Sequence, residues 1–378
     1  MQDKGAPVAS REAALLACTL LIGRLGASFE PYAVRLLPVF LTCYSDLSSV
    51  IRDAAEAAAA ALAATLTPAG VKLVLPPVLA AMGDRAWKKK ESALQLLATL
   101  ARRTPRQVGR GLPLAIPVVV ACLQDTHPKV AAAAVATLAD VASVITQPEI
   151  QRNMVTLIEA LSKPETKTAA CLEKLMETTF VNSMDAAALS VIVPVVTRGL
   201  RERSAELKKI AAMTAGNIFA LVNDPRDMAP FLPSVLPEVT KAIEHSHPDV
   251  RSAAERAKVK LLKGSKVEKA AAGAKPPPPR ASLAAHVRAS LAALPEPVAS
   301  YAAEVAEELL EDREVVGAEG LAAALSPVVG PFLDATAVDA LATSTVALHD
   351  DNLAAAAEED EHAGKDCAFW GWDLGKRS

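Results

Sequence analysis

The chain has 378 residues, with 40 Lys and Arg against 43 Asp and Glu, and its residues are 51% hydrophobic but only 3% aromatic. Its longest apolar runs, 57–66 and 112–123, are shorter than the ~18 residues of a membrane-spanning helix, so we expect no membrane partner. The five cysteines show no CxxC spacing and no close pairs, which indicates a reducing, cytoplasmic compartment. An Ala-rich, aromatic-poor composition favours helices over strands, and the fold class is predicted to be all-α.

Charge is distributed unevenly along the chain. Residues 1–264 hold 31 basic and 24 acidic side chains, whereas residues 265–378 hold 9 basic and 19 acidic ones. A basic body therefore precedes an acidic tail, and the near-neutral total conceals two segments that prefer opposite kinds of charged partner.

The first 264 residues contain an internal repeat. A unit with Leu36-Leu-Pro38 and Val50-Ile-Arg-Asp-Ala-Ala55 returns as Val235-Leu-Pro237 and Val250-Arg-Ser-Ala-Ala254. The second helices of successive units are expected near Ile51, Lys90, Val130, Thr168, Leu207 and Val250, at steps of 39, 40, 38, 39 and 43 residues. That period is typical of HEAT repeats, helix pairs that stack on their neighbours to bury their apolar faces. We predict a HEAT-repeat α-solenoid, an armadillo-like superhelix, over 1–264, with one half repeat and six full repeats.

Prolines mark the boundaries within these units. Pro128 and Pro248 stand where a second helix is expected to begin, a position that tolerates proline because its N–H has no helical partner. Alanines in the second helices, as at 58–61 and 131–134, are expected to let neighbouring helices approach closely.

The period ends after Leu262, and three further segments follow. Residues 265–281 are Lys-rich and contain four consecutive prolines, which predicts a linker. Residues 282–349 are expected to form a small helical bundle, with helices near 283–294, 298–310, 319–325 and 335–348. Residues 350–378 are predicted to be an acidic tail that ends in an aromatic stretch around Phe369.

Catalytic and ligand-binding motifs are missing from the sequence. The patterns GxxxxGK[ST], HExxH, CxxC and GxSxG do not occur. His245, His247 and Asp249 repeat the turn pattern of His127, so we interpret them as turn residues rather than metal ligands. We therefore expect a protein that is not an enzyme, with no cofactor, no metal and no small-molecule substrate.

Basic clusters at the repeat turns are the remaining functional signal. The two clusters that we select as candidate ribosome- or RNA-binding residues are Trp87, Lys88, Lys89, Lys90 and Arg198, Arg201, Arg203, Lys208, Lys209. Cations along one edge of a solenoid would neutralise phosphates and give salt-dependent binding without sequence readout, although basic side chains also simply solvate helix ends. Reversing the charge at Lys88, Lys89 and Lys90 is expected to weaken binding while leaving the array folded.

Several stretches of the repeats resemble a known family. Residues 171–182, Ala215-Gly-Asn-Ile218 and Ala229-Pro-Phe-Leu-Pro233 look like the N-terminal HEAT region of fungal-type translation elongation factor 3. They are also similar to the related segment of the giant ribosome-associated HEAT scaffold that activates the amino-acid-starvation kinase. The predicted bundle follows the repeats as it does in the elongation factor, and the end of the acidic tail resembles the lead-in to that family's first ATP-binding cassette, whose Walker motifs this sequence lacks.

The resemblance implies a ribosome-binding module that acts in translation elongation or its regulation. It also implies small-subunit proteins and ribosomal RNA as partners, besides other possible protein partners. An alternative from a different class is a TOG-like array that binds tubulin or microtubules, because such arrays also place Trp and Lys in their intra-repeat turns, as in Trp87-Lys-Lys-Lys90. The string from residue 171 to 233 favours the ribosome over tubulin.

Overall fold

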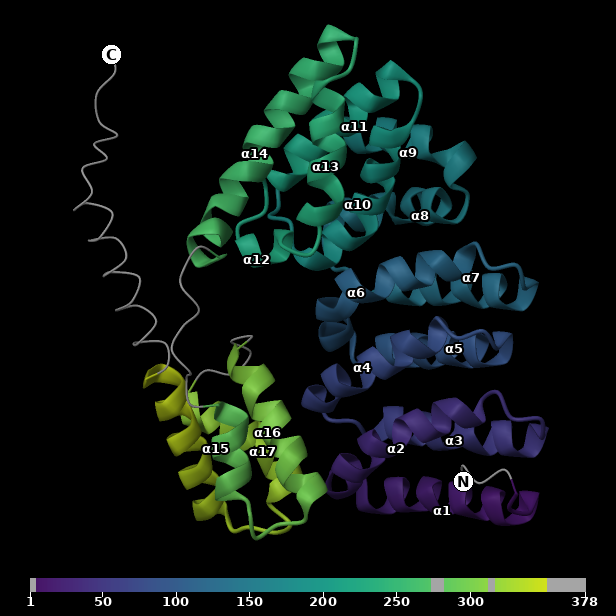
Figure 1. The fold of residues 1–378 in the computed structure, drawn as a ribbon, viewed down its shortest axis with the longest axis vertical. Helices are drawn as coiled ribbons and strands as arrows, with labels where there is room; N and C mark the ends of the chain where they lie inside the picture. The colour runs from purple at the N-terminus through teal and green to yellow at the C-terminus, as the bar shows by residue number, and fades with distance from the viewer. Residues whose placement is uncertain (1–4, 273–281, 312–316, 352–378) are drawn as a thin grey trace. The chain divides into compact units, whose positions relative to one another are not determined.

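The computed structural model describes residues 5–272, 282–311 and 317–351 (Figure 1). Contacts divide the chain into two compact units. Unit 1 comprises residues 1–20, 36–64 and 71–269, and unit 2 comprises residues 21–35, 65–70 and 270–378. Helices account for the regular structure of the described residues, and the one β interaction found there is an isolated bridge between Met184 and Val222.

The predicted helix pairs are present along the whole repeat region. The first helices of the pairs are α2 (Glu30–Cys43), α4 (Pro68–Met82), α6 (Pro105–Leu123), α8 (Pro148–Ser162), α10 (Ala186–Arg201) and the broken α12 (Pro225–Met228) with α13 (Leu232–Ile243). The second helices are α3 (Ser49–Thr65), α5 (Trp87–Arg103), α7 (Pro128–Ala142), α9 (Pro164–Glu177), α11 (Ala205–Phe219) and α14 (Pro248–Ala272). A single helix, α1 (Val8–Leu25), precedes them. The all-α HEAT solenoid is thus confirmed, and the count of one half and six full repeats stays a prediction.

Local sequence explains where these helices begin. Pro128 and Pro248 are the first residues of α7 and α14, as their missing N–H predicts. Elsewhere a side chain caps the helix: the carboxylate of Asp185 accepts a hydrogen bond from the N–H of Ala188 at 2.8 Å, and the hydroxyl of Ser204 accepts one from Leu207 at 3.4 Å.

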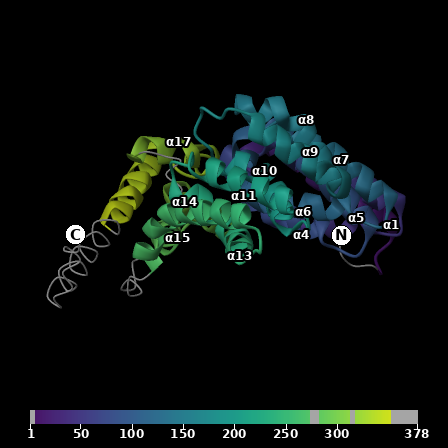
Figure 2. The ribbon, with the colours of Figure 1, turned by 90° about the horizontal axis from the view of Figure 1, so that it is seen from above.

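Small side chains allow the close packing within unit 1. Ala58 and Ala134 are fully buried, and a Cβ added to Gly216 would lie 3.2 Å from the Cα of Ala257 on α14. Helices α5 and α7 pack along each other, as do α8 and α9 (Figure 2), and the hydroxyl of Thr137 donates to the carbonyl of Leu94 at 3.1 Å. Each helix pair therefore closes the core of its neighbours, as expected of a solenoid.

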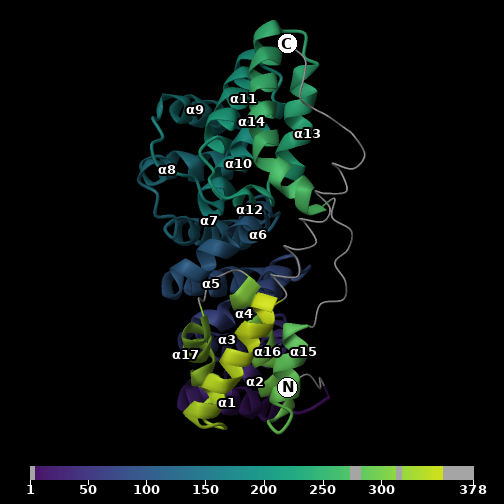
Figure 3. The same cartoon turned by 90° about the vertical axis from the view of Figure 1, so that its left-hand side faces the viewer.

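Unit 2 contains the predicted C-terminal helices. They are α15 (Leu283–Ser290), α16 (Glu296–Glu311), α17 (Gly317–Val329) and a helix that starts at residue 335 and continues to 351, the last described residue (Figure 3). All four overlap the helical segments predicted from the sequence. The same unit includes residues 21–35 and 65–70, which the sequence analysis assigned to the repeats alone.

A buried carboxylate joins the three segments of unit 2. Glu30, 2% exposed, accepts hydrogen bonds from the N–H of Thr67 at 2.9 Å, from its hydroxyl at 2.8 Å, and from the hydroxyl of Tyr301 on α16. Burial raises the pKa of Glu30, and the three donors oppose that shift. Nearby, Arg35 donates to both carboxylate oxygens of Glu296, at 2.5 and 3.0 Å.

Helix α14 is longer than the sequence suggested. It runs to Ala272, so the first residues of the segment predicted as a linker, 265–272, are helical. A chain rich in Ala and Lys can continue a helix, and the stretch with four consecutive prolines comes only afterwards. Residues 273–281 and most of the predicted acidic tail lie outside the described residues, and the domain boundaries at 264, 281 and 349 stay predictions.

Two helical stretches within the described residues, Val8–Cys43 and Pro105–Leu123, are long and apolar enough to cross a membrane by length and composition alone. The second is α6, whose Val108, Leu112 and Ile116 are fully buried in the repeat core, which accounts for their apolar character. The cysteines Cys18, Cys43, Cys122 and Cys171 are free and buried. Burial raises the pKa of Cys171 to about 11, which keeps this thiol protonated and unreactive at neutral pH.

Candidate functional site

Three aspartates organise the turns between paired helices. Asp46, Asp84 and Asp125 each accept a hydrogen bond from the backbone N–H two residues further on, at 3.0, 3.0 and 2.8 Å respectively. In the last repeat the ring of His245 plays the same part and accepts from the N–H of His247 at 3.2 Å. His245 and His247 are therefore turn residues, as interpreted from the sequence.

Basic side chains tie these turns to the preceding repeat. Arg11 of α1 pairs with Asp46, and Lys90 of α5 pairs with Asp125 at 2.6 Å. Lys209 of α11 reaches Asp249 of α14 at 3.1 Å. The Lys90 ammonium, together with the N–H of His127, holds the pKa of Asp125 below its usual range. We call these three ion pairs, which join successive repeats at the turn edge of unit 1, the ladder.

Two lysines of the predicted cluster, Lys89 and Lys90, are paired with aspartates in the structure. Lys89 pairs with Asp84 at 2.8 Å, and Lys90 and Asp125 are only 21% and 13% exposed. Reversing the charge at Lys89 or Lys90 would set two like charges against each other in a partly buried position. The expectation that charge reversal there leaves the array intact is therefore revised for these two residues, because both have structural partners that lie in a turn, one of them in the next repeat.

Trp87 and Lys88 lie in a cluster that spans two turns. The Trp87 ring stacks on the His127 ring, with centroids 4.1 Å apart and planes 8° from parallel. The ammonium groups of Lys88 and Lys129 lie 5.7 and 5.3 Å from the centroid of the Trp87 ring, within cation–π range. We call Trp87, Lys88, His127 and Lys129 the Trp87 cluster; it presents two cations beside a stacked pair of rings.

His127 and Lys129 are members of this cluster that lie outside the runs of basic residues in the sequence. Helix α5 begins at Trp87 and α7 begins at Pro128, so Lys88 and Lys129 occupy the same position in successive repeats. Superimposing the repeats on their helix starts, rather than searching for runs of basic residues, would have found the pair.

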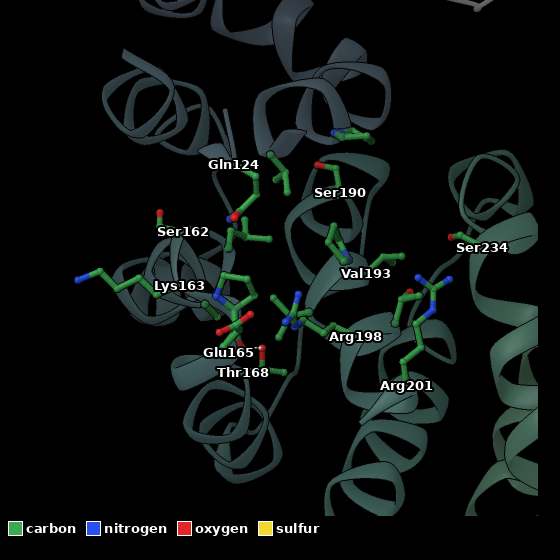
Figure 4. A pocket seen from close by; sticks show the side chains of 18 of the residues that line it. Gln124, Ser162, Lys163, Glu165, Thr168, Ser190, Val193, Arg198, Arg201 and Ser234 are labelled. Atoms are coloured by element: carbon green, nitrogen blue, oxygen red, sulfur yellow. Dashed lines mark hydrogen bonds between the residues drawn. The ribbon is translucent and has the colours of Figure 1, made fainter. Parts of the chain in front are cut away.

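The second predicted cluster is divided among several environments. Lys209 belongs to the ladder, whereas Arg203 is exposed and Lys208 half-buried at the turn between α10 and α11. Arg198 and Arg201 lie on α10 and line a groove of about 1170 Å³ (Figure 4). Arg201 pairs with Glu238 at 3.1 Å, and Arg198 lies 3.8 Å from Glu202. The structure therefore does not bring the five residues together as one patch.

Some cations at the turns have no acidic partner within the part of the chain that the structure describes. They include Arg85, Lys88, Lys129, Arg203 and Lys208, as well as Lys163 between α8 and α9. Because their charge is not neutralised by a carboxylate of the described residues, these side chains are available to an anionic partner. Over the same residues, no group of three or more His, Cys, Asp or Glu side chains gathers in a way that would hold a metal ion.

Comparison with known families identifies the repeats. The EF3 N-terminal HEAT repeat matches residues 1–138, and the Elongation factor 3/GNC1 HEAT repeat matches residues 165–272. Both matches cover the part of the chain that the structure shows as helix pairs, and the turns described above belong to them.

Three relatives illustrate the similarity. Protein ILITYHIA of Arabidopsis thaliana is 45% identical over 260 residues, covering 67% of this chain and 10% of the plant protein. The human stalled ribosome sensor GCN1 is 39% identical over 254 residues, covering 67% of this chain and 10% of the human protein. Elongation factor 3 of Gonapodya prolifera is 34% identical over 237 residues, covering 62% of this chain and 22% of the factor.

This chain therefore spans only a tenth to about a fifth of the length of these relatives. What it shares with these proteins is a HEAT-repeat region. The chain belongs to the family of elongation factor 3 and GCN1 HEAT-repeat proteins.

Proposed function

We propose that this chain is a ribosome-binding HEAT module that acts in the cytoplasm, in translation elongation or its regulation, and has no enzymatic activity by itself. Two of its relatives carry names that tie them to the ribosome or to elongation, the stalled ribosome sensor GCN1 and elongation factor 3. The shared region is the helix-pair array, so the array is the part of the chain to which we assign the binding.

The observation that carries this proposal is the set of unneutralised cations at the repeat turns. Lys88 and Lys129 lie beside the Trp87 ring in adjacent repeats, and Arg203 and Lys208 lie at a turn further along unit 1. A lysine neutralises phosphate as a point charge, and the half-buried Trp87 ring, already stacked on His127, lies beside Lys88 and Lys129. The Trp87 cluster therefore has the chemistry to contact ribosomal RNA, and the remaining turn cations suit RNA or acidic surfaces of small-subunit proteins.

The experiment is co-sedimentation of the purified chain with 80S ribosomes across a salt series, in parallel with polymerised and free tubulin. We expect ribosome binding that weakens steeply as salt rises, because binding to phosphates releases counterions. Binding to tubulin alone would contradict the proposal and favour a TOG-like function instead. Absence of binding to either partner would also contradict it.

A further inference from the structure

The groove lined by Arg198 and Arg201 is distinct from the Trp87 cluster, and nothing in the proposed function uses it. Its walls come from α6, the turn between α8 and α9, α10 and the start of α13, all within unit 1 (Figure 4). At about 1170 Å³ it is larger than the pockets of about 300–1,000 Å³ that hold small molecules. Its size fits a segment of chain.

Unsatisfied polar atoms gather in the lining of this groove. Ser162 Oγ, Thr197 Oγ1 and Arg198 Nε are buried and have no hydrogen-bond partner among the described residues, and all three residues line it. Thr197 as a whole is only 8% exposed. Buried polar groups are normally hydrogen-bonded, so an accumulation in one place indicates a site that a partner completes.

Prolines add backbone acceptors to the same lining. Pro117 and Pro194 lie inside α6 and α10 and lack an N–H, so the carbonyls of Pro113 and Ser190 do not receive the helical donor four residues on. Pro113 and Ser190 both line the groove. A ligand with N–H donors would therefore be complementary to these carbonyls.

Charge decides which kind of chain fits. Lys163, Arg198 and Arg201 are the cations of the lining, and Glu165 and Glu202 are its carboxylates. Arg201 is already engaged by Glu238, which is 11% exposed, whereas Arg198 has only a loose contact of 3.8 Å to Glu202. Two carboxylates and two open carbonyls would repel the continuous phosphates of a nucleic acid, but a peptide supplies backbone N–H donors together with an isolated acidic side chain.

We propose that this groove binds an extended peptide segment of a partner protein, with an Asp or Glu side chain of the peptide paired to Arg198. The guanidinium can receive a carboxylate in a bidentate arrangement, and the backbone of the peptide runs past the Pro113 and Ser190 carbonyls. This site is independent of the Trp87 cluster and of ribosome binding.

The test uses random dodecapeptides displayed on phage and selected on the purified full chain. Selected peptides, synthesised with a fluorescent label, are expected to contain a recurring Asp or Glu, and replacing it by Asn or Gln should weaken binding at least 10-fold. The variant R198Q should lose as much affinity for the unchanged peptide. The Asn or Gln peptide should bind R198Q only slightly more weakly than it binds the wild type, because the two changes remove the same ion pair. The variant R152Q, an exposed arginine of α8 outside the groove, should bind like the wild type.

A second variant tests the groove without changing a charge, and its result does not depend on whether R198Q folds. The variant P194A restores an N–H to α10 that can occupy the Ser190 carbonyl, so it should bind the peptides several-fold more weakly while the helix gains stability. The proposal would be overturned if no peptide is recovered or if the recovered peptides lack an acidic residue. It would also be overturned if R198Q and P194A bind the peptides as tightly as the wild type does. Binding of oligo(U) RNA that is lost in R198Q would overturn it in favour of a nucleic-acid site.

Discussion

Lys90 Nζ lies 2.6 Å from Asp125 Oδ2, a contact between the second helix of one repeat and the turn of the next. The same separation of 35 positions joins Arg11 to Asp46. In both cases a basic residue reaches an aspartate whose other oxygen holds its own turn. Some of the turn cations therefore hold the array together, and only the others are free for a partner.

Replacing Lys90 by Gln should destabilise unit 1. Asp125 would lose its ammonium partner in a position that is 13% exposed, and a hydrogen bond to a charged group contributes about 1.5–3 kcal/mol. Urea unfolding followed by circular dichroism measures the change. The control K88Q removes a neighbouring lysine without a carboxylate partner and should shift the free energy of unfolding by about 0.5 kcal/mol or less. Equal effects of the two variants would contradict the structural role of Lys90.

The contribution of this pair should depend on pH. The folded pKa of Asp125 is held below its usual 3.8, so the unfolded chain takes up the proton first as the pH falls. The stabilisation is therefore fully present well above pH 3.8 and disappears as the pH falls through the lower folded pKa. The difference in unfolding free energy between the wild type and K90Q should be constant from neutral pH down to about pH 5 and shrink below pH 4. A difference that grows on acidification would rule out this origin.

Replacing Tyr301 by Phe should loosen unit 2. Glu30 would keep its two donors from Thr67 but lose the Tyr301 hydroxyl, and Tyr301 is only 4% exposed. We expect a loss of about 1–3 kcal/mol, seen as faster amide hydrogen exchange in α15 and α16. Tyr32, a half-buried tyrosine of the same unit, is the matched control, since its hydroxyl has no partner among the described residues and Y32F should exchange like the wild type. Unchanged exchange in Y301F would contradict the anchoring role of Glu30.

Gly199 should not tolerate alanine. A Cβ there would collide with Leu172 Cδ1 and lie 2.9 Å from Ala211 Cβ, so α9 and α11 would have to move. Overpacking of this kind costs about 1–3 kcal/mol, measurable as a lower midpoint of thermal unfolding. At Gly23, near the end of α1, a Cβ meets nothing within 4 Å, so G23A should be neutral or gain about 0.5 kcal/mol from helix propensity. A stable G199A variant would show that these helices are less tightly packed than described.

The helix pairs could be predicted from the sequence because each repeat carries the same signals. A proline starts α7 and another starts α14, and the apolar positions recur with the helix pair. The place of residues 21–35 and 65–70 in unit 2 could not be predicted in this way. It depends on single contacts such as Glu30 with Tyr301, which lie 271 positions apart and follow no period.

The candidate site was predicted only in part, for a related reason. Runs of basic residues showed where cations are abundant but not which of them are neutralised. Lys89 and Lys90 are neutralised by Asp84 and Asp125, of which the second lies in the next repeat. Lys129, isolated in the sequence, contributes to the Trp87 cluster because its repeat position matches that of Lys88.

The most direct test of the proposed function is the salt dependence of 80S ribosome binding by two charge-matched double variants. K88Q/K129Q removes both cations of the Trp87 cluster, and R152Q/K258Q removes two cations of α8 and α14 that have no acidic partner among the described residues. Each phosphate contact contributes about 0.7–0.9 to the slope of log affinity against log salt, so K88Q/K129Q should bind more weakly with a slope smaller by about 1.5. R152Q/K258Q should keep the wild-type slope. Identical slopes for both variants and the wild type would contradict ribosome binding through the repeat turns.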